Sequence, residues 1–185
     1  MRCGMKRINV YLADGFEEIE AVTIIDVLRR GEIKVFTVSV KESLMVKGAH
    51  GIEIKADINI KSMEADLDGH ILPGGPGAEI LFKSEELKKV FMEANEGEKL
   101  LGAICAAPSV LGRWGLLKGK KATAYPGNEK YLVGADIRAD AVVTDGNIFT
   151  SRGPGTAMEF GLSLVEELSG KTKMQQVKAR LLYNK

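Results

Sequence analysis

The chain has 185 residues, 45% of them hydrophobic, and 26 Lys and Arg against 25 Asp and Glu leave a formal net charge of +1. This length and composition fit one globular domain over residues 1–185. Nucleic-acid binding is not expected, because it normally requires a basic excess. The sequence has no run of about 18 apolar residues, so we expect no membrane-spanning helix and no membrane partner.

The two cysteines of the chain are Cys3 and Cys105. Cys3 stands within residues 1–5, which we expect to form a tail. A disulfide framework is therefore not predicted, and a reducing, cytoplasmic compartment is favoured. The N-terminus lacks the apolar core of a signal peptide. Cysteines and histidines show no zinc-binding spacing, so we predict neither a metal nor another cofactor.

Strand and helix patterns alternate from the N-terminus. We expect a strand over 7–13 and then a helix from Asp14, with Glu17 three residues later as in a capping box. Apolar residues recur at helical spacing as far as Gly31. A second strand is predicted over 33–40 and a glycine-containing hairpin over 46–56.

The middle and C-terminal parts continue this alternation. Strands are predicted over 69–73, 100–104, 121–125, 141–145 and 148–150, and helices over 84–96, 106–114, 154–168 and 173–182. Repeated strand–helix units predict an α/β fold with a mainly parallel sheet and helices on both faces. Ligands bind such sheets beyond the carboxyl ends of the strands, so the residues that follow each strand are the candidates for a site.

Cys105 lies where an apolar strand runs directly into an alanine-rich helix. The sharp turn resembles a nucleophile elbow with Cys in place of Ser, and free N–H groups at a helix start stabilise a thiolate. We predict a reactive thiol. The alternative is a buried structural cysteine, since free cysteines are often buried.

Three carboxylates, Glu17, Glu18 and Glu20, follow the first strand. At about 100° per residue, Glu17 falls near the middle of the apolar helix face and the other two flank it. At least one should point toward the sheet, where it could hold a proton beside a thiol. The alternative is that all three simply favour the helix dipole.

Glycines and basic residues after other strands give weaker signals. Gly74 and Gly75 allow the backbone to approach a ligand and serve as an oxyanion site, or they form a plain turn. Arg152 could bind an anion, or it is a surface residue beside a capping Ser151. We expect His70 to be a structural histidine before a buried strand and His50 to be exposed.

Four segments closely resemble the ThiJ/PfpI superfamily, in particular its DJ-1 branch: residues 13–20, 72–75, 103–108 and 150–155. The resemblance runs from about residue 6 to residue 178. It implies a flavodoxin-like three-layer sandwich, related to class I glutamine amidotransferases, and a homodimer. It also implies a set of site residues: Cys105 as a nucleophile readily oxidised to sulfinate, Glu20 as the carboxyl group bonded to its sulfur, Glu17 near the pocket, the backbone of Gly75 and Ala106 as the oxyanion site, and Arg152 and Pro154 at the pocket border.

This sequence departs from the family at two positions. Tyr125 stands where the family often has a histidine, so a protease-like Cys–His pair has no candidate there and peptidase activity is not expected. Glu20 is then the expected proton carrier, and Tyr125 can only donate a hydrogen bond. His50 lies where close relatives have a cationic residue at an anion-binding spot, which implies weaker, pH-dependent anion binding here.

Two functions from different classes follow. The first is a cofactor-independent glyoxalase III or deglycase type enzyme that acts on α-oxoaldehydes such as methylglyoxal, or on their adducts with proteins, through Cys105 and Glu20. The second is a redox-sensing stress protein or chaperone in which Cys105 is oxidised without turnover. A hydrolase or thiamine-pathway role, suggested by the older family name, has no independent support in the sequence.

Overall fold

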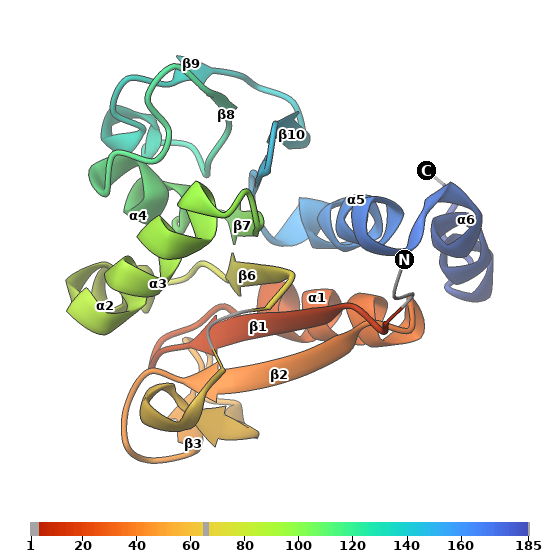
Figure 1. Cartoon of the computed structure of the whole chain (residues 1–185), viewed down its shortest axis with the longest axis horizontal. Helices are drawn as coiled ribbons and strands as arrows, with labels where there is room; N and C mark the ends of the chain where they lie inside the picture. Colours follow the sequence, from red (N-terminus) through yellow and green to blue (C-terminus); the bar gives the residue numbers. More distant parts are fainter. Residues whose placement is uncertain (1–3, 65–66, 185) are drawn as a thin grey trace.

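A computed structural model describes residues 4–64 and 67–184. Its centre is a seven-stranded sheet in the order β10-β11-β7-β6-β1-β2-β5 (Figure 1). All neighbouring strands are parallel except the β10–β11 hairpin. The strands of this sheet are β1 (Arg7–Leu12), β2 (Lys34–Ser39), β5 (Ile58–Asn59), β6 (Gly69–Leu72), β7 (Leu100–Ile104), β10 (Val142–Asp145) and β11 (Ile148–Ser151).

Helices cover both faces of this sheet and complete a three-layer sandwich. One face carries α1 (Glu18–Arg30) and α5 (Ala157–Ser169), against which α6 (Lys171–Arg180) packs. The other face carries α2 (Ala78–Lys83), α3 (Glu85–Glu96) and α4 (Pro108–Arg113). Figure 1 shows the two groups on opposite sides of the strands. The predicted α/β sandwich with a mostly parallel sheet is therefore confirmed.

Alternation along β1 explains why each face has its own core. Ile8, Val10 and Leu12 are buried in the cluster with α1 and α5, whereas Tyr11 is buried in the cluster with α3 and α4. Successive side chains of a strand point to opposite faces, so one short strand supplies both cores. This two-sided burial is typical of a central parallel strand.

The first helix begins later than predicted. Asp14 does not cap it; the carboxylate of Asp14 binds the Lys41 ammonium and the Lys47 backbone N–H instead. The N-cap is Glu17, whose side chain accepts a hydrogen bond from the Glu20 N–H at 2.7 Å. The predicted cap was wrong because a remote lysine competes for the Asp14 side chain.

Other boundaries differ in ways that shape the site. The strand predicted over 121–125 is only β8 (Lys121–Ala122), and it pairs with β9 (Asp136–Ile137) outside the main sheet. The helix predicted over 106–114 shortens to α4, and α2 was not predicted. The predicted hairpin over 46–56 is confirmed as β3 (Met45–Lys47) and β4 (Glu53–Lys55). Short 3₁₀ turns cover Ile60–Ser62, Glu129–Tyr131 and Pro154–Thr156.

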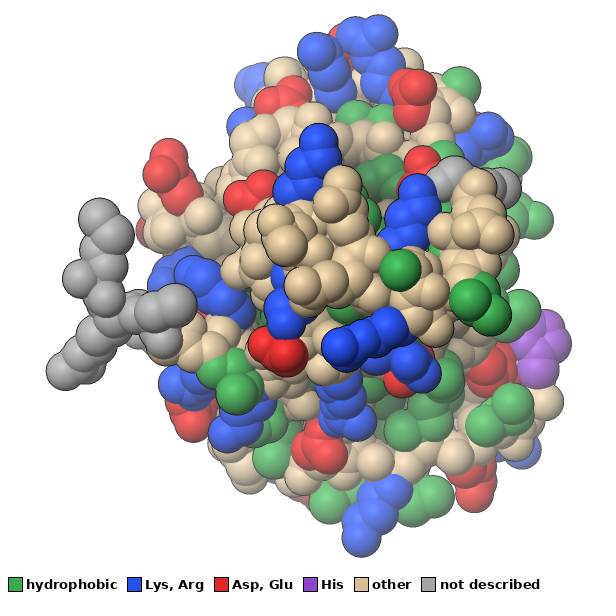
Figure 2. Space-filling model, turned by 90° about the vertical axis from the view of Figure 1, so that its right-hand side faces the viewer, with side chains coloured by type: hydrophobic (Ala, Val, Ile, Leu, Met, Phe, Trp, Pro, Cys, Tyr) green, Lys and Arg blue, Asp and Glu red, His purple; other side chains and the backbone are tan. Residues whose placement is uncertain are grey.

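The surface carries charges of both signs. Figure 2 shows Lys and Arg side chains interspersed with Asp and Glu over the face it presents, consistent with the net charge of +1. Among the described residues, no helix is long and apolar enough to cross a membrane. Of the predicted tail, Gly4 and Met5 are exposed, while residues 1–3, including Cys3, lie outside the described residues.

Candidate active site

Cys105 occupies a strained turn at the carboxyl end of β7. Its φ of 65° lies in the left-handed region, which residues other than glycine seldom adopt. The Cys105 N–H donates to the Ser151 carbonyl at 2.9 Å, and the Cys105 carbonyl accepts from the Tyr125 N–H at 2.8 Å. Both sides of the peptide are therefore held in place, as strain at a functional turn requires. Cys105 is buried, with 8% of its surface exposed.

Glu20 brings a carboxyl group to this thiol from the first turn of α1. Its side chain is fully buried, and its Oε2 accepts a hydrogen bond from the Gly74 N–H at 2.8 Å. Burial raises the pKa of Glu20 to about 7; hydrogen bonds with Cys105 and Gly74 oppose the rise, and the nearby Glu17 adds to it. Glu20 can therefore both hold and release a proton near neutral pH.

The ionisation of the Cys105 thiol depends on the neighbouring Glu20 carboxyl group. Burial, the Glu20 charge and the Glu20 hydrogen bond raise the pKa of Cys105 to about 12, whereas N–H groups of Gly75 and Ala106 stabilise the thiolate. The sulfur thus remains a thiol while Glu20 is ionised. Transfer of the thiol proton to Glu20 also removes the repelling charge, so the pair can give a thiolate beside a neutral carboxyl group.

The glycine loop after β6 allows this close approach. A Cβ on Gly74 would lie 2.6 Å from the Cys105 Cβ and 2.8 Å from the Glu20 Oε2. Gly75 has a φ of 87°, and a Cβ there would lie 2.5 Å from the Gly15 carbonyl oxygen. Only residues without a side chain fit between the thiol, the carboxyl group and the first loop. The Gly74 N–H is occupied by Glu20, so the donors at the sulfur are Gly75 and Ala106.

Glu17 and Glu20 have different positions from those that helical spacing suggests. Glu17 has extended backbone and caps α1, so it is not on the apolar helix face. The helix begins at Glu18, and within its first turn Glu20 is the fully buried carboxylate. The preference for Glu17 from helical geometry was therefore wrong, and the structure places Glu20 beside the thiol.

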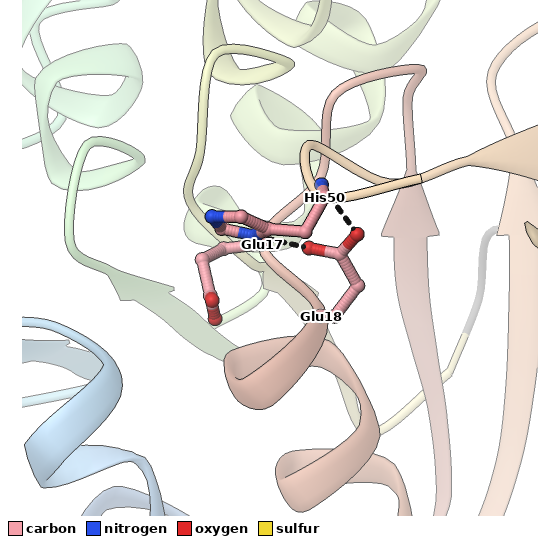
Figure 3. Close-up of side chains that lie close together, drawn as sticks. All are labelled: Glu17, Glu18 and His50. Carbon is pink, nitrogen blue, oxygen red and sulfur yellow. Dashed lines mark hydrogen bonds and ion pairs between the residues drawn. The ribbon is translucent and has the colours of Figure 1, made fainter. Parts of the chain in front are cut away.

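Glu18 fixes the turn of the β3–β4 hairpin against α1. Its Oε1 accepts from the His50 N–H at 2.6 Å, and its Oε2 bonds the His50 Nδ1 at 2.9 Å, as the dashed lines of Figure 3 show. A Cβ on Gly48 would lie 2.3 Å from this carboxylate. Burial raises the pKa of Glu18, but the hydrogen bonds from His50 outweigh it and lower the value below its usual range.

Ligand atoms of Glu17, Glu18 and His50 lie within 4.8 Å of one another (Figure 3). Both Glu18 oxygens are already occupied by N–H groups of the hairpin, including the Ile52 N–H at 3.4 Å. We therefore assign this cluster a structural role, which is to hold the β3–β4 hairpin against α1. His50 is exposed, as predicted, and its pairing with Glu18 raises its pKa, which favours the cationic form.

The remaining predicted residues lie in two places, near the turn at Cys105 and on the opposite face of the sheet. Tyr125, Arg152 and Pro154 together line a shallow hollow of about 250 Å³. Ser151 does not cap a helix; its hydroxyl bonds the Ala141 carbonyl and the Thr156 hydroxyl. His70 is buried on the opposite face, where its Nδ1 bonds the Tyr11 hydroxyl at 2.8 Å, in keeping with a structural histidine.

Comparison with known proteins identifies the family. A model of the DJ-1/PfpI family matches residues 6–167, nearly nine tenths of the chain. The chain belongs to the DJ-1/PfpI family. This DJ-1/PfpI protein is 43% identical over 183 residues to the protein DJ-1 homolog B of Arabidopsis thaliana, across 97% of this chain but 42% of that one. It thus spans less than half the length of this plant relative.

Other members of the DJ-1/PfpI family match over most of their length. The glutathione-independent glyoxalase DJR-1.2 of Caenorhabditis elegans is 35% identical over 159 residues, which cover 85% of each chain. The crystal structure of Drosophila melanogaster DJ-1beta superimposes with a TM-score of 0.95 at 39% identity, over 98% of this chain and 100% of that one. Oxidized Toxoplasma gondii DJ-1 gives a TM-score of 0.94 at 38% identity, over 97% and 100%.

Proposed function

We propose that this chain is a cofactor-independent cysteine enzyme that converts α-oxoaldehydes such as methylglyoxal into hydroxy acids. The observation that carries the proposal is the fully buried Glu20 carboxyl group, which the Gly74 N–H holds at 2.8 Å in the space beside Cys105. A relative of the same family carries the name glutathione-independent glyoxalase. Both point to thiol chemistry that needs no added thiol.

The proposed reaction begins with attack by Cys105 on the aldehyde carbon. The thiol proton passes to Glu20 as the carbon–sulfur bond forms, and the aldehyde oxygen becomes an oxyanion near the Gly75 and Ala106 N–H groups. Glu20 then returns the proton to this oxygen, which gives a neutral hemithioacetal and an ionised Glu20.

Glu20 next moves a proton between neighbouring carbons. The carboxylate removes the proton from the former aldehyde carbon, and the hydroxyl proton on that carbon moves to the adjacent carbonyl oxygen, which gives an enediol. Glu20 then delivers its proton to the second carbon. The first carbon is thereby oxidised to a thioester and the second reduced to an alcohol, so no external oxidant or reductant is needed. Water hydrolyses the thioester, and the hydroxy acid and the free thiol are released. Adducts of such aldehydes with proteins are proposed as further substrates.

Conversion of methylglyoxal to lactate by the wild type, Cys105→Ser and Glu20→Gln tests this proposal. Turnover by the wild type that both variants lose would support it. Equal rates in the wild type and Cys105→Ser would overturn it. The proposed setting is the cytoplasm, where a free thiol stays reduced.

A redox-sensing role is the second candidate, because one related structure is that of an oxidized DJ-1. Each molecule of peroxide would transfer one oxygen atom to the Cys105 sulfur and leave as water, giving sulfenate and then sulfinate. A protonated Glu20 would donate a hydrogen bond to the product. Peroxide treatment that oxidises Cys105 no faster than a free cysteine would exclude this role.

We also propose a homodimer. Large apolar side chains are exposed at the start of α1 and in the adjoining hairpin, namely Ile19 (58%), Val22 (49%), Met45 (44%) and Ile52 (57%). The bond from the Ile52 N–H to Glu18 places the hairpin beside α1. An exposed apolar group of this kind is typical of a subunit interface. Analytical ultracentrifugation of the wild type and Ile19→Glu tests it, and a monomeric wild type would refute it.

A further inference from the structure

The hollow lined by residues 125–126 and 152–156 adjoins the backbone of Cys105 on two sides. The Tyr125 N–H donates to the Cys105 carbonyl at 2.8 Å, and the Cys105 N–H donates to the carbonyl of Ser151, the residue before the second wall, at 2.9 Å. The first wall is thus hydrogen-bonded to Cys105 through its own residue Tyr125. The second wall is bonded to Cys105 through Ser151, the residue that precedes it. The two walls of the hollow therefore flank the turn that carries the Cys105 side chain.

The walls of this hollow present an apolar surface. Tyr125 is 48% exposed, although a large aromatic side chain in a loop would usually be better covered. The edge of its ring lies close to Gly153, where a Cβ would be 3.1 Å from the ring Cδ2, so the glycine allows this close approach. Pro126 and Pro154 extend the apolar wall.

The Arg152 guanidinium at the edge of the hollow is bonded to a neighbouring loop. The Arg152 guanidinium donates to the Ala139 carbonyl at 3.3 Å, which directs it toward the neighbouring loop. The hollow is thus lined by one aromatic ring, two prolines, two glycines and Thr156, whose hydroxyl is bonded to the Gly153 carbonyl, with the Arg152 charge at the edge. Such a surface binds an apolar group and gains nothing from a small polar one.

We propose that this hollow binds the non-reacting substituent of the α-oxoaldehyde and that Tyr125 makes the site selective for apolar, above all aromatic, substituents. This inference rests on the proposed function, because it assigns the substrate class of the same site. An aromatic substituent stacks on the Tyr125 ring, whereas the methyl group of methylglyoxal leaves that ring in contact with water. Tyr125 acts as a specificity-determining residue and takes no part in proton transfer.

Kinetics with two substrates test the selectivity. We expect the ratio of kcat/KM for phenylglyoxal to kcat/KM for methylglyoxal to fall about 10-fold in Tyr125→Ala and to stay unchanged in Tyr125→Phe, which keeps the ring. The matched control is Tyr131→Ala, which removes another exposed tyrosine, 39% exposed and outside the hollow. It should leave the ratio at the wild-type value. A ratio in Tyr125→Ala equal to that of the wild type would overturn the proposal.

Alkylation of Cys105 separates this inference from the proposed function. Phenacyl bromide and bromoacetone both form a carbon–sulfur bond with release of bromide, and they differ in the same phenyl and methyl groups. The ratio of their rates should show the same 10-fold fall, to an order of magnitude, in Tyr125→Ala. A protein without turnover that shows this fall would refute the enzyme proposal and keep the subsite. If Tyr125→Ala does not fold, Tyr125→Gln must show the fall, and an unchanged alkylation ratio there overturns the subsite.

Discussion

The Gly74 backbone N–H holds the Glu20 carboxyl group at 2.8 Å, and the missing side chain of the same glycine leaves the space in which that carboxyl group meets Cys105. One residue therefore both positions the proton carrier and permits its approach to the thiol. The arrangement explains why the loop after β6 needs glycine at this point, whichever chemistry the thiol performs.

Gly74→Ala should damage the site and the fold together. The added methyl group would collide with Cys105, Glu20 and the Ile104 carbonyl, all within 2.8 Å and all buried. We expect a loss of about 1–3 kcal/mol in unfolding free energy, measured by urea denaturation, and a loss of turnover. Gly97→Ala is the control, since its Cβ would meet its nearest atom at 3.5 Å. Equal stability of the two variants would contradict the collision.

Glu20→Gln should lower the pKa of the Cys105 thiol while it abolishes catalysis. The Glu20 charge is one cause of the raised thiol pKa, and the amide removes it. The pH midpoint of Cys105 alkylation by iodoacetamide should therefore move to lower pH, while α-oxoaldehyde turnover falls by about 100-fold or more. Glu96→Gln, an exposed change, serves as the control. A midpoint that moves to higher pH would show that the carboxylate stabilises the thiolate.

Glu20 should also make the protein less stable as the pH rises. Its pKa in the folded protein, about 7, exceeds the ordinary value of 4.5, so the folded state binds the proton more tightly than the unfolded state. The contribution of Glu20 to the unfolding free energy should be largest below pH 4.5. It should then decrease as the pH rises to about 7, by at most about 3 kcal/mol in total. Glu20→Gln should flatten the decrease. Parallel curves for both proteins across this range would argue against the shift.

The bond between Glu18 and His50 should stabilise the hairpin within a window of pH. The lowered pKa of Glu18 adds stability above about pH 4.5 that is lost as the pH falls through the folded-state value. The raised pKa of His50 adds stability below about pH 6.5 that is lost as the pH rises through its folded-state value. Protection of the His50 and Ile52 amides from hydrogen exchange, measured relative to the intrinsic rate at each pH, should be greatest between these limits.

Glu18→Gln should abolish that window. The amides of the hairpin turn lose a charged acceptor, so their exchange should accelerate at every pH between the two limits. Glu53→Gln changes an exposed carboxylate on β4 of the same hairpin and should leave exchange unchanged. If both variants exchange at the same rate, the hairpin is held by contacts other than Glu18.

Sequence patterns predicted the sheet and the thiol but misplaced the carboxylate. β-branched runs bounded by glycines predicted the main strands, and the direct passage from strand to helix predicted the turn at Cys105. The start of α1 depended on which acid caps it. The Asp14 carboxylate binds Lys41, which lies 27 residues away, and so it does not cap the helix. Local spacing cannot predict this long-range partner. Because α1 begins at Glu18, four residues after Asp14, Glu17 lies outside the helix and Glu20 is the carboxylate that the helix buries. Resemblance to the family, and not periodicity, identified Glu20.

The short length of β8 was also hidden from the sequence. A run of residues favourable to a strand follows Lys121, but the Tyr125 N–H is used by the Cys105 carbonyl. Long-range partners decide such cases, because a backbone donor can satisfy only one acceptor. Resemblance to the family placed Arg152 and Pro154 at the pocket border, but no local pattern predicted that Tyr125 and Pro126 line the same hollow.

The hydrogen bonds that hold Cys105 also set the order in which this protein can become reactive. The Ser151 carbonyl that accepts from Cys105 lies 46 residues further along the chain, in a strand that pairs directly with β7. Closing so long a loop costs entropy, and contacts of this kind form late relative to local ones. During synthesis the thiol therefore emerges from the ribosome well before its supporting strand. The raised pKa of the Cys105 thiol therefore belongs to the completed fold, and a nascent chain carries an ordinary cysteine.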